Sequence, residues 1–203
     1  MVVEIYVEGG GQAKELKSQC REGFRNFFEK AGIESRMLRI IACGPRRKAY
    51  DFFRKAIGKA ENHKLLLLLV DSEAPVDDSA SPWAHLKSRE DDGWDKPPNA
   101  DENSVHLMVQ CMESWFLADK EALAKFYGQG FAGKSLPANP NIERIPKQDI
   151  SKSLKRATAK TIRGGYDKGR DSFKILALID PTKVRAASSH AGRLFDTLAS
   201  RSA

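Results

Sequence analysis

The sequence predicts an α/β protein with a mostly parallel sheet of about four strands, flanked by helices. Residues 65–70 form an unbroken run of five leucines and a valine. This is the length of a strand buried on both faces of a parallel sheet, and it is far too short to span a membrane. Strand-like and helix-like segments also alternate from residue 2 to residue 70, which is the order that builds such a sheet.

The alternation begins at the N-terminus. Val2–Val7 is β-branched or aromatic at nearly every position, and Gly9–Gly11 then allow a turn. Apolar side chains recur with helical spacing from residue 12 to residue 31. A second apolar run at Met37–Cys43 predicts the second strand, and another amphipathic helix leads from it to the strand at residues 65–70.

Residues 74–104 interrupt the alternation with prolines, acidic residues and two tryptophans. We expect a long excursion over the top of the sheet, because loops of this length in a compact domain are usually functional. Its Trp83 and Trp94 either stack on nucleic-acid bases or cover the core. A fourth strand is predicted at Val105–Cys111 and a helical stretch at Met112–Tyr127.

Two regions are therefore predicted. Residues 1–128 form the α/β core, and residues 129–203 form a basic, mostly helical extension packed on it. Within the extension, residues 129–150 are rich in Gly, Pro and Asn and are predicted to be irregular. Helices are predicted at Ile150–Thr161, Phe173–Ile179 and Ser189–Ala199.

The net charge of +7 is distributed unevenly. Residues 129–203 contain 15 Lys and Arg against 6 Asp and Glu, whereas residues 1–128 contain 19 against 21. A basic C-terminal third beside a slightly acidic core suits a phosphate-rich partner, either nucleic acid or a nucleotide; the alternative is a solvated basic surface.

The three cysteines, Cys20, Cys43 and Cys111, are widely separated and form no metal-binding pattern. They are typical of buried thiols in a reducing compartment, so we expect a cytoplasmic protein without disulfides. No segment resembles a signal peptide or a membrane span, and no membrane partner is expected.

Acidic residues follow two of the predicted strands. Glu8 ends the first strand, and Asp71 and Glu73 end the third. Alternation along an extended strand would place Asp71 and Glu73 on the same side. Three carboxylates at one edge of a sheet repel each other unless a cation is present, and Mg²⁺ or Mn²⁺ prefers such ligands. The alternative is that each carboxylate caps a helix or faces water.

Further candidates lie near the same edge. Glu113 follows the fourth strand and could bind a second metal, orient a water molecule, or simply place negative charge at the start of a helix. Phosphate could be bound by backbone N–H groups of a glycine run and by a set of basic side chains. These residues are Gly9, Gly10, Gly11, Arg46, Arg47, Lys48 and Lys168.

Two of these motifs resemble a known metal-binding domain. Val7-Glu8-Gly9 is similar to the first motif of the Toprim fold, a Rossmann-like domain of topoisomerases, primases and overcoming-lysogenization-defect-type nucleases. Asp71-Ser72-Glu73 occupies the place of its Asp-x-Asp motif, with Glu as the second acid. Gln12 stands near the place of a second glutamate in the nuclease-type motif. These two departures leave the reaction less defined than the metal site.

The resemblance extends to a Toprim-like bacterial family, domain of unknown function 4276. It rests on the following stretches: Val7–Gly11, Leu67–Glu73, Met108–Asp119, Tyr166–Gly169 and Ile179–Pro181. It implies a Toprim-like fold and a bound metal ion.

The sequence and this resemblance together predict a Mg²⁺- or Mn²⁺-dependent nuclease. Glu8, Asp71, Glu73 and Glu113 are the predicted catalytic residues, and the first three are the predicted metal ligands. By resemblance, a role in defence against foreign DNA is expected. The alternative is a non-catalytic module that binds nucleic acid or a partner protein.

Overall fold

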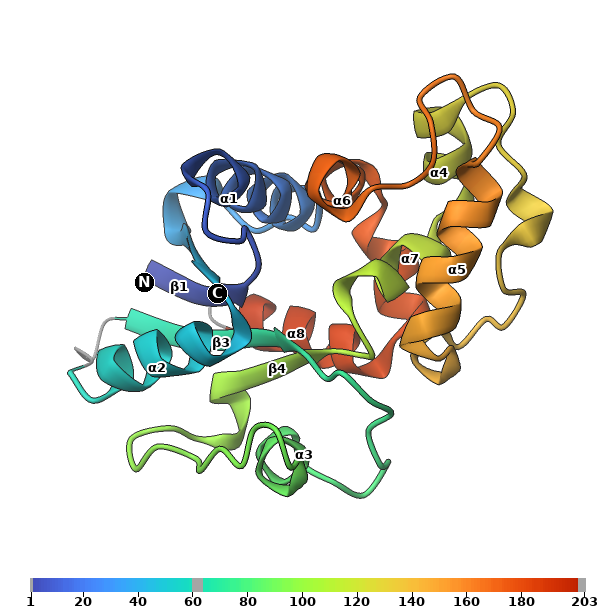
Figure 1. Cartoon of the computed structure of the whole chain (residues 1–203). Coiled ribbons are helices and arrows are strands. Elements are labelled where there is room, and N and C mark those ends of the chain that lie inside the picture. Colours follow the sequence, from blue (N-terminus) through green and yellow to red (C-terminus); the bar gives the residue numbers. More distant parts are fainter. Residues whose placement is uncertain (1, 60–63, 201–203) are drawn as a thin grey trace.

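A computed structural model describes residues 2–59 and 64–200, and it contains one parallel sheet (Figure 1). The strands are β1 (Val2–Glu8), β2 (Leu38–Gly44), β3 (Lys64–Asp71) and β4 (Val105–Met108). Their order in the sheet is β2-β1-β3-β4, and every pairing is parallel. The predicted α/β class with a parallel sheet is confirmed. Met1, residues 60–63 and residues 201–203 lie outside the described part. The first residue of the predicted core and the last three residues of the predicted extension are therefore not described.

The leucine run is strand β3, and helices cover both of its faces. Leu67 and Leu69 belong to the apolar cluster of α1 (Lys14–Lys30), whereas Leu66 and Leu68 belong to the cluster of α2 (Arg46–Ile57). Burial of one such side chain stabilises the fold by about 1.5–3 kcal/mol. Because neither face meets water, the strand needs no polar alternation.

The face of α1 is also covered by the C-terminal region. Side chains of α6 (Lys168–Leu178) and α8 (Ser189–Ala199) share the apolar cluster of α1, and Figure 1 shows α6 beside α1. Trp115 stacks on Phe27 with ring centroids 5.3 Å apart. One continuous apolar cluster therefore contains residues from both sides of position 128.

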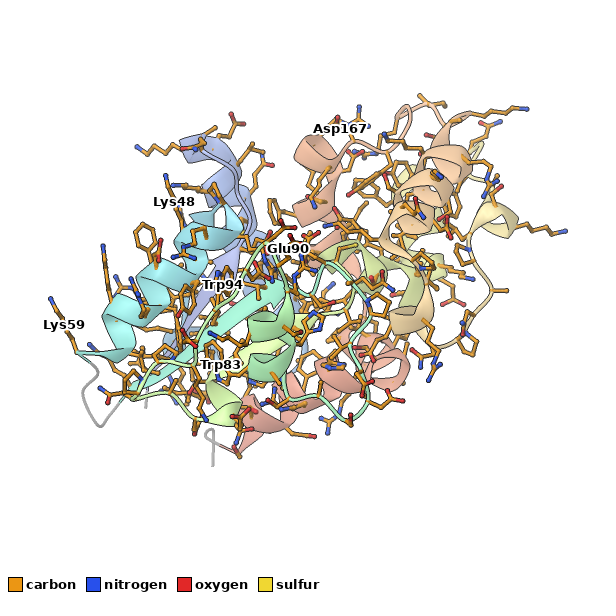
Figure 2. All side chains as sticks on the ribbon, turned by 60° about the horizontal axis from the view of Figure 1, so that its bottom comes forward. Lys48, Lys59, Trp83, Glu90, Trp94 and Asp167 are labelled. Carbon is orange, nitrogen blue, oxygen red and sulfur yellow. The ribbon has the colours of Figure 1, made fainter. Side chains whose placement is uncertain are left out.

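The opposite face is covered by α2 and by residues 74–104, which include α3 (Pro82–Ser88). Trp94 stacks on Tyr50 with centroids 4.6 Å apart, and the Trp83 indole donates a hydrogen bond to the Asp101 carbonyl (2.9 Å). Both tryptophans are buried beside α2 (Figure 2). The tryptophans of this excursion therefore cover the core, and its Asp92 also reaches Arg46 beside the carboxyl ends of β1 and β3.

The chain after β3 and β4 departs from the prediction in detail. Strand β4 ends at Met108, because the N–H groups of Gln110 and Cys111 donate to the Ser114 hydroxyl at 3.1 and 3.4 Å. The predicted helical stretch is divided at Asp119, whose carboxylate accepts from the Ala122 N–H (3.3 Å) and begins a new helix.

The remaining elements are α-helices that follow residue 119 and short 3-10 turns spread along the chain. The α-helices are α4 (Lys120–Tyr127), α5 (Lys147–Thr158) and α7 (Pro181–Ala187), and the 3-10 turns are Ser35–Met37, Glu102–Ser104, Met112–Ala118, Gly133–Ser135 and Ile142–Arg144. Helices α5 and α6 begin three and five residues earlier than predicted. For α6 the reason is Asp167, whose carboxylate accepts from the Arg170 N–H at 2.8 Å and caps the helix. Within the described residues, no helix has the length and apolar composition needed to cross a membrane.

The strand order decides where a ligand site can form. From β1 the chain crosses to β2 on one side and then returns to β3 on the other side. Parallel sheets open a crevice at the carboxyl ends of the two strands where the direction of winding reverses. Here those strands are β1 and β3, and their last residues are Glu8 and Asp71.

The end of β2 allows a test of how tightly this edge is packed. Gly44 has φ +80°, it exchanges two backbone hydrogen bonds with Gly9 (3.0 and 2.8 Å), and a Cβ there would lie 2.5 Å from the Gly11 carbonyl oxygen. We expect Gly44→Ala to lower the free energy of unfolding by about 3 kcal/mol in urea titrations, because backbone strain and steric overlap add.

Gly32→Ala is the matched control. Gly32 has φ +85°, and a Cβ there would meet no atom within 4 Å. It should lose only the roughly 1 kcal/mol that a left-handed backbone costs a residue with a side chain. Equal losses in the two variants would contradict a role for the close approach at Gly44.

Candidate metal centre

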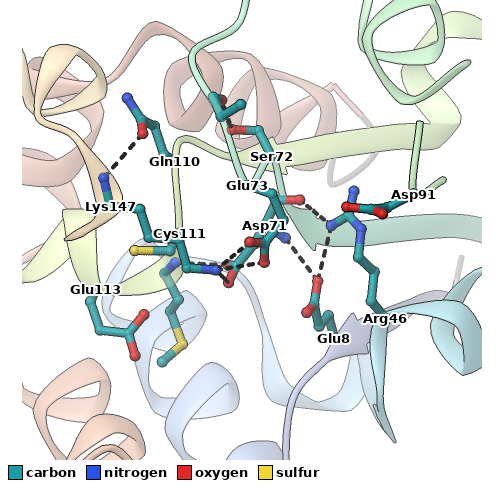
Figure 3. A network of polar contacts seen from close by, with 12 residues as sticks. Glu8, Arg46, Asp71, Ser72, Glu73, Asp91, Gln110, Cys111, Glu113 and Lys147 are labelled. Atoms are coloured by element: carbon teal, nitrogen blue, oxygen red, sulfur yellow. Dashed lines mark hydrogen bonds and ion pairs between the residues drawn. The ribbon is translucent and has the colours of Figure 1, made fainter. Parts of the chain in front are cut away.

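Three carboxylates converge at the carboxyl ends of β1 and β3. One oxygen from each of Glu8, Asp71 and Glu73 lies within 4.8 Å of the others (Figure 3). Strand alternation does not bring Glu73 there, because β3 ends at Asp71. Glu73 instead adopts φ +64°, and its N–H donates to the Gln110 carbonyl (2.8 Å). Such a conformation in a residue other than glycine costs about 1–2 kcal/mol and tends to occur at functional sites.

Asp71 lies at the centre of the group and is 5% exposed. Its Oδ1 accepts from the Met112 N–H at 2.8 Å, and its own N–H donates to the Glu8 carboxylate at 3.2 Å. Burial, followed by the nearby charges of Glu8 and Glu113, raises the pKa of Asp71 to about 8. Burial and the charge of Glu73 also raise the pKa of Glu8, although Arg46 opposes this shift.

Two cations partly neutralise the group. The Arg46 guanidinium donates to Glu8 Oε2 (3.1 Å) and to the Asp71 carbonyl (Figure 3). It is held in place by two hydrogen bonds to the buried carboxylate of Asp92, at 2.8 and 2.7 Å, and by the Trp94 ring 4.9 Å away. The second cation is Lys147, which begins α5.

Lys147 comes from the C-terminal region. Its ammonium group lies 2.6 Å from the Glu73 carboxylate and 3.9 Å from Asp71 Oδ2. Its backbone N–H donates to the Gln110 side chain at 3.1 Å, which fixes the start of α5 against the end of β4. Lys147 is 35% exposed in its side chain, so this ion pair is open to solvent on one side.

Glu113 is buried beside the group but is not one of the three converging residues. Its Oε1 accepts from the Tyr166 hydroxyl (3.1 Å) and pairs with the Lys168 ammonium (3.0 Å). Its Oε2 is buried without a hydrogen-bond partner among the described residues. Burial alone would raise the pKa of Glu113, but Lys168 and the hydrogen bonds lower it. Glu113 and Asp71 therefore favour opposite protonation states.

The other predicted phosphate-binding residues lie elsewhere or are already engaged. Arg47 pairs with Asp51 (3.5 Å), and Lys48 is exposed on α2. The Gly9 N–H donates to Gly44. Gly10 is buried, and a Cβ there would lie 2.9 Å from the Cα of Lys17, so this glycine allows close packing on α1. Gly11 is exposed with φ +53°.

Three residues that surround the site could not be identified as such from the sequence. Lys147 follows Pro146 within a segment predicted to be irregular, and Asp92 is one of many acids in residues 74–104. Tyr166 belongs to a stretch that resembled the family, but nothing in the sequence placed it beside Glu113.

The donor set fits a hard divalent cation. Carboxylate oxygens are the ligands that Mg²⁺ and Mn²⁺ prefer, and zinc sites usually include histidine or cysteine. The raised pKa values of Asp71 and Glu8 indicate that Arg46 and Lys147 do not fully compensate the carboxylates. A divalent ion would supply the missing positive charge.

The raised pKa of Asp71 makes the stability of the metal-free protein depend on pH. Between pH 4 and 8 the folded protein retains a proton that the unfolded chain has released. The free energy of unfolding should therefore fall as pH rises from 5 to 8, by on the order of 3–4 kcal/mol. Asp71→Asn should flatten this dependence, because an asparagine side chain does not titrate. The variant should still fold, since its Oδ1 can accept from the Met112 N–H.

Denaturant titrations in chelator at several pH values measure this dependence. Asp91→Asn is the control, because the Asp91 side chain is 91% exposed and should leave the pH dependence as in the wild type. A wild-type protein that gains stability from pH 5 to 8 would contradict the assignment.

Comparison with known proteins gives a match to one protein family. The family model described as domain of unknown function 4276 matches residues 7–199, a range that contains all four predicted catalytic residues. Neither a curated protein nor a solved structure gives a significant match. Since the match spans nearly the whole chain, the protein belongs to the family of domain of unknown function 4276.

Proposed function

We propose that this protein is a Mg²⁺- or Mn²⁺-dependent nuclease in which Glu8, Asp71 and Glu73 hold the metal. The observation that carries the proposal is the convergence of these three carboxylates at the crevice between β1 and β3. Without a cation, this arrangement costs the fold stability, because burial and mutual repulsion both disfavour the charged forms. Such a cost is typical of functional sites.

The metal and the side chains around it would have different roles in the reaction. A bound divalent ion activates water and stabilises the leaving oxygen in phosphodiester cleavage. Arg46 is fixed by Asp92 and would remain beside Glu8. Lys147 is partly exposed and lies 2.6 Å from Glu73 and 3.9 Å from Asp71 Oδ2, so a metal on these two carboxylates would free its ammonium group for a substrate phosphate.

Nucleic acid is the proposed substrate because of the charge distribution. The basic residues of the C-terminal region include Lys147 and Lys168, which lie beside the carboxylates. Lysines that contact phosphates bind nucleic acid with little dependence on base sequence. The Toprim resemblance adds support for nuclease chemistry and for defence against foreign DNA, and this part rests on analogy.

A second candidate is a non-catalytic module that binds nucleic acid or a partner protein. It is favoured by one observation: Arg46 already pairs with Glu8, and Lys147 pairs with Glu73 and, at 3.9 Å, with Asp71. In such a module these ion pairs would be permanent, and no metal would enter.

Metal titration separates the two candidates. We expect Mn²⁺ to bind the wild-type protein in calorimetry and to raise its melting temperature. Asp71→Asn should weaken binding at least tenfold, because the central ligand loses its charge. Glu15→Gln is the control, since Glu15 is exposed in the first turn of α1. No metal-dependent heat in the wild type would exclude the nuclease and leave the binding module.

Cleavage of plasmid and single-stranded DNA with Mn²⁺ tests the reaction itself. Glu8→Gln should reduce the rate at least a hundredfold, because a proposed metal ligand loses its charge. The protein should remain folded, because the amide oxygen can still accept from Arg46 and from the Asp71 N–H. Circular dichroism checks the fold. Full activity in this variant would remove Glu8 from the site.

A further inference from the structure

A pocket of about 320 Å³ lies between α5, the first turn of α6 and the 3-10 turn after β4. Its lining includes Glu113, Lys147, Ile150, Lys155, Tyr166 and Lys168. The volume is at the small end of the range for ligand pockets, with room for a single nucleotide unit. Since three segments enclose it, the pocket suits a single nucleotide better than a strand passing through.

The lining combines positive charge with an apolar wall. Lys147, Lys155 and Lys168 all reach it, and Ile150 and Cys111 are buried in its wall. Lys147 and Lys168 pair with Glu73 and Glu113. Lys155 makes no ion pair within residues 2–59 and 64–200, so its charge is available to a ligand. Asp167 also lines the pocket, and its carboxylate caps α6 by accepting from the Arg170 N–H.

The second observation is the unsatisfied oxygen of Glu113. Its side chain is 8% exposed, and its Oε2 has no partner among the described residues. A buried acceptor without a hydrogen bond costs about 1–3 kcal/mol. A hydroxyl group of a ligand in the adjacent pocket could donate to it, whereas a fully ionised phosphate could not. The pocket thus calls for a ligand that carries both a phosphate and a hydroxyl.

We propose that this pocket binds a free nucleoside 5′-monophosphate, with Lys155 and Lys168 on its phosphate monoester. The sugar hydroxyl would donate to Glu113 Oε2, and Ile150 would contact the apolar part. A monoester carries more negative charge than an internal diester, which matches the group of lysines. This inference rests on the proposed function, because the pocket lies beside its carboxylates, and it specifies a nucleoside 5′-monophosphate as the product that the nuclease releases.

Calorimetry on the full chain tests the pocket without metal. The probes are thymidine 5′-monophosphate, thymidine and inorganic phosphate. We expect the monophosphate to bind at least tenfold more tightly than either of the other two. Lys155→Ala should weaken its binding about tenfold, since a charge-assisted contact is lost. Lys152→Ala is the control, because Lys152 is exposed on α5 and is not part of the lining.

The proposal is overturned if the monophosphate does not bind, or if Lys152→Ala weakens its binding as much as Lys155→Ala. Asp71→Asn separates this result from the metal site, because it should retain monophosphate binding while losing Mn²⁺. Monophosphate binding without Mn²⁺ binding in the wild type would refute the nuclease and support the pocket. Mn²⁺ binding without monophosphate binding would refute the pocket alone.

Discussion

The electrostatic repulsion among Glu8, Asp71 and Glu73 is the constraint on which the rest of the structure depends. The sheet brings the ends of two buried strands together, and each end delivers a carboxylate. Burial, together with the charges of Glu8 and Glu113, raises the pKa of Asp71 and favours its protonated form. The surrounding elements then supply positive charge.

The two long segments that depart from regular strand–helix alternation each hold one cation. Residues 74–104 contribute Asp92 and Trp94, which fix the guanidinium of Arg46 beside Glu8. The C-terminal region contributes Lys147, which pairs with Glu73. The two cations differ in how firmly they are held. The Arg46 side chain is 15% exposed and makes two hydrogen bonds to Asp92, whereas Lys147 is 35% exposed and can exchange one anionic partner for another.

Asp71 and Glu113 show how neighbouring carboxyl groups can differ. Both are buried, yet burial and like charges favour the protonated form of Asp71, while Lys168 and Tyr166 favour the ionised form of Glu113. Pairs of acids in opposite states commonly perform different tasks in one site. Here Asp71 is one of the three converging carboxylates, and Glu113 lines a pocket that also contains lysines. Metal and anion would thus occupy adjacent but distinct places.

The sequence by itself determined the parallel sheet and the acidic ends of β1 and β3, because burial on both faces leaves a continuous apolar run and parallel strands end at one edge. It also indicated the helical C-terminal region through periodicity. Only the tertiary structure decided that Glu73 reaches the group through a left-handed backbone, and that Lys147, Asp92 and Tyr166 surround it. These contacts join residues far apart in the chain, and local patterns of hydrophobicity and charge contain no information about such pairings.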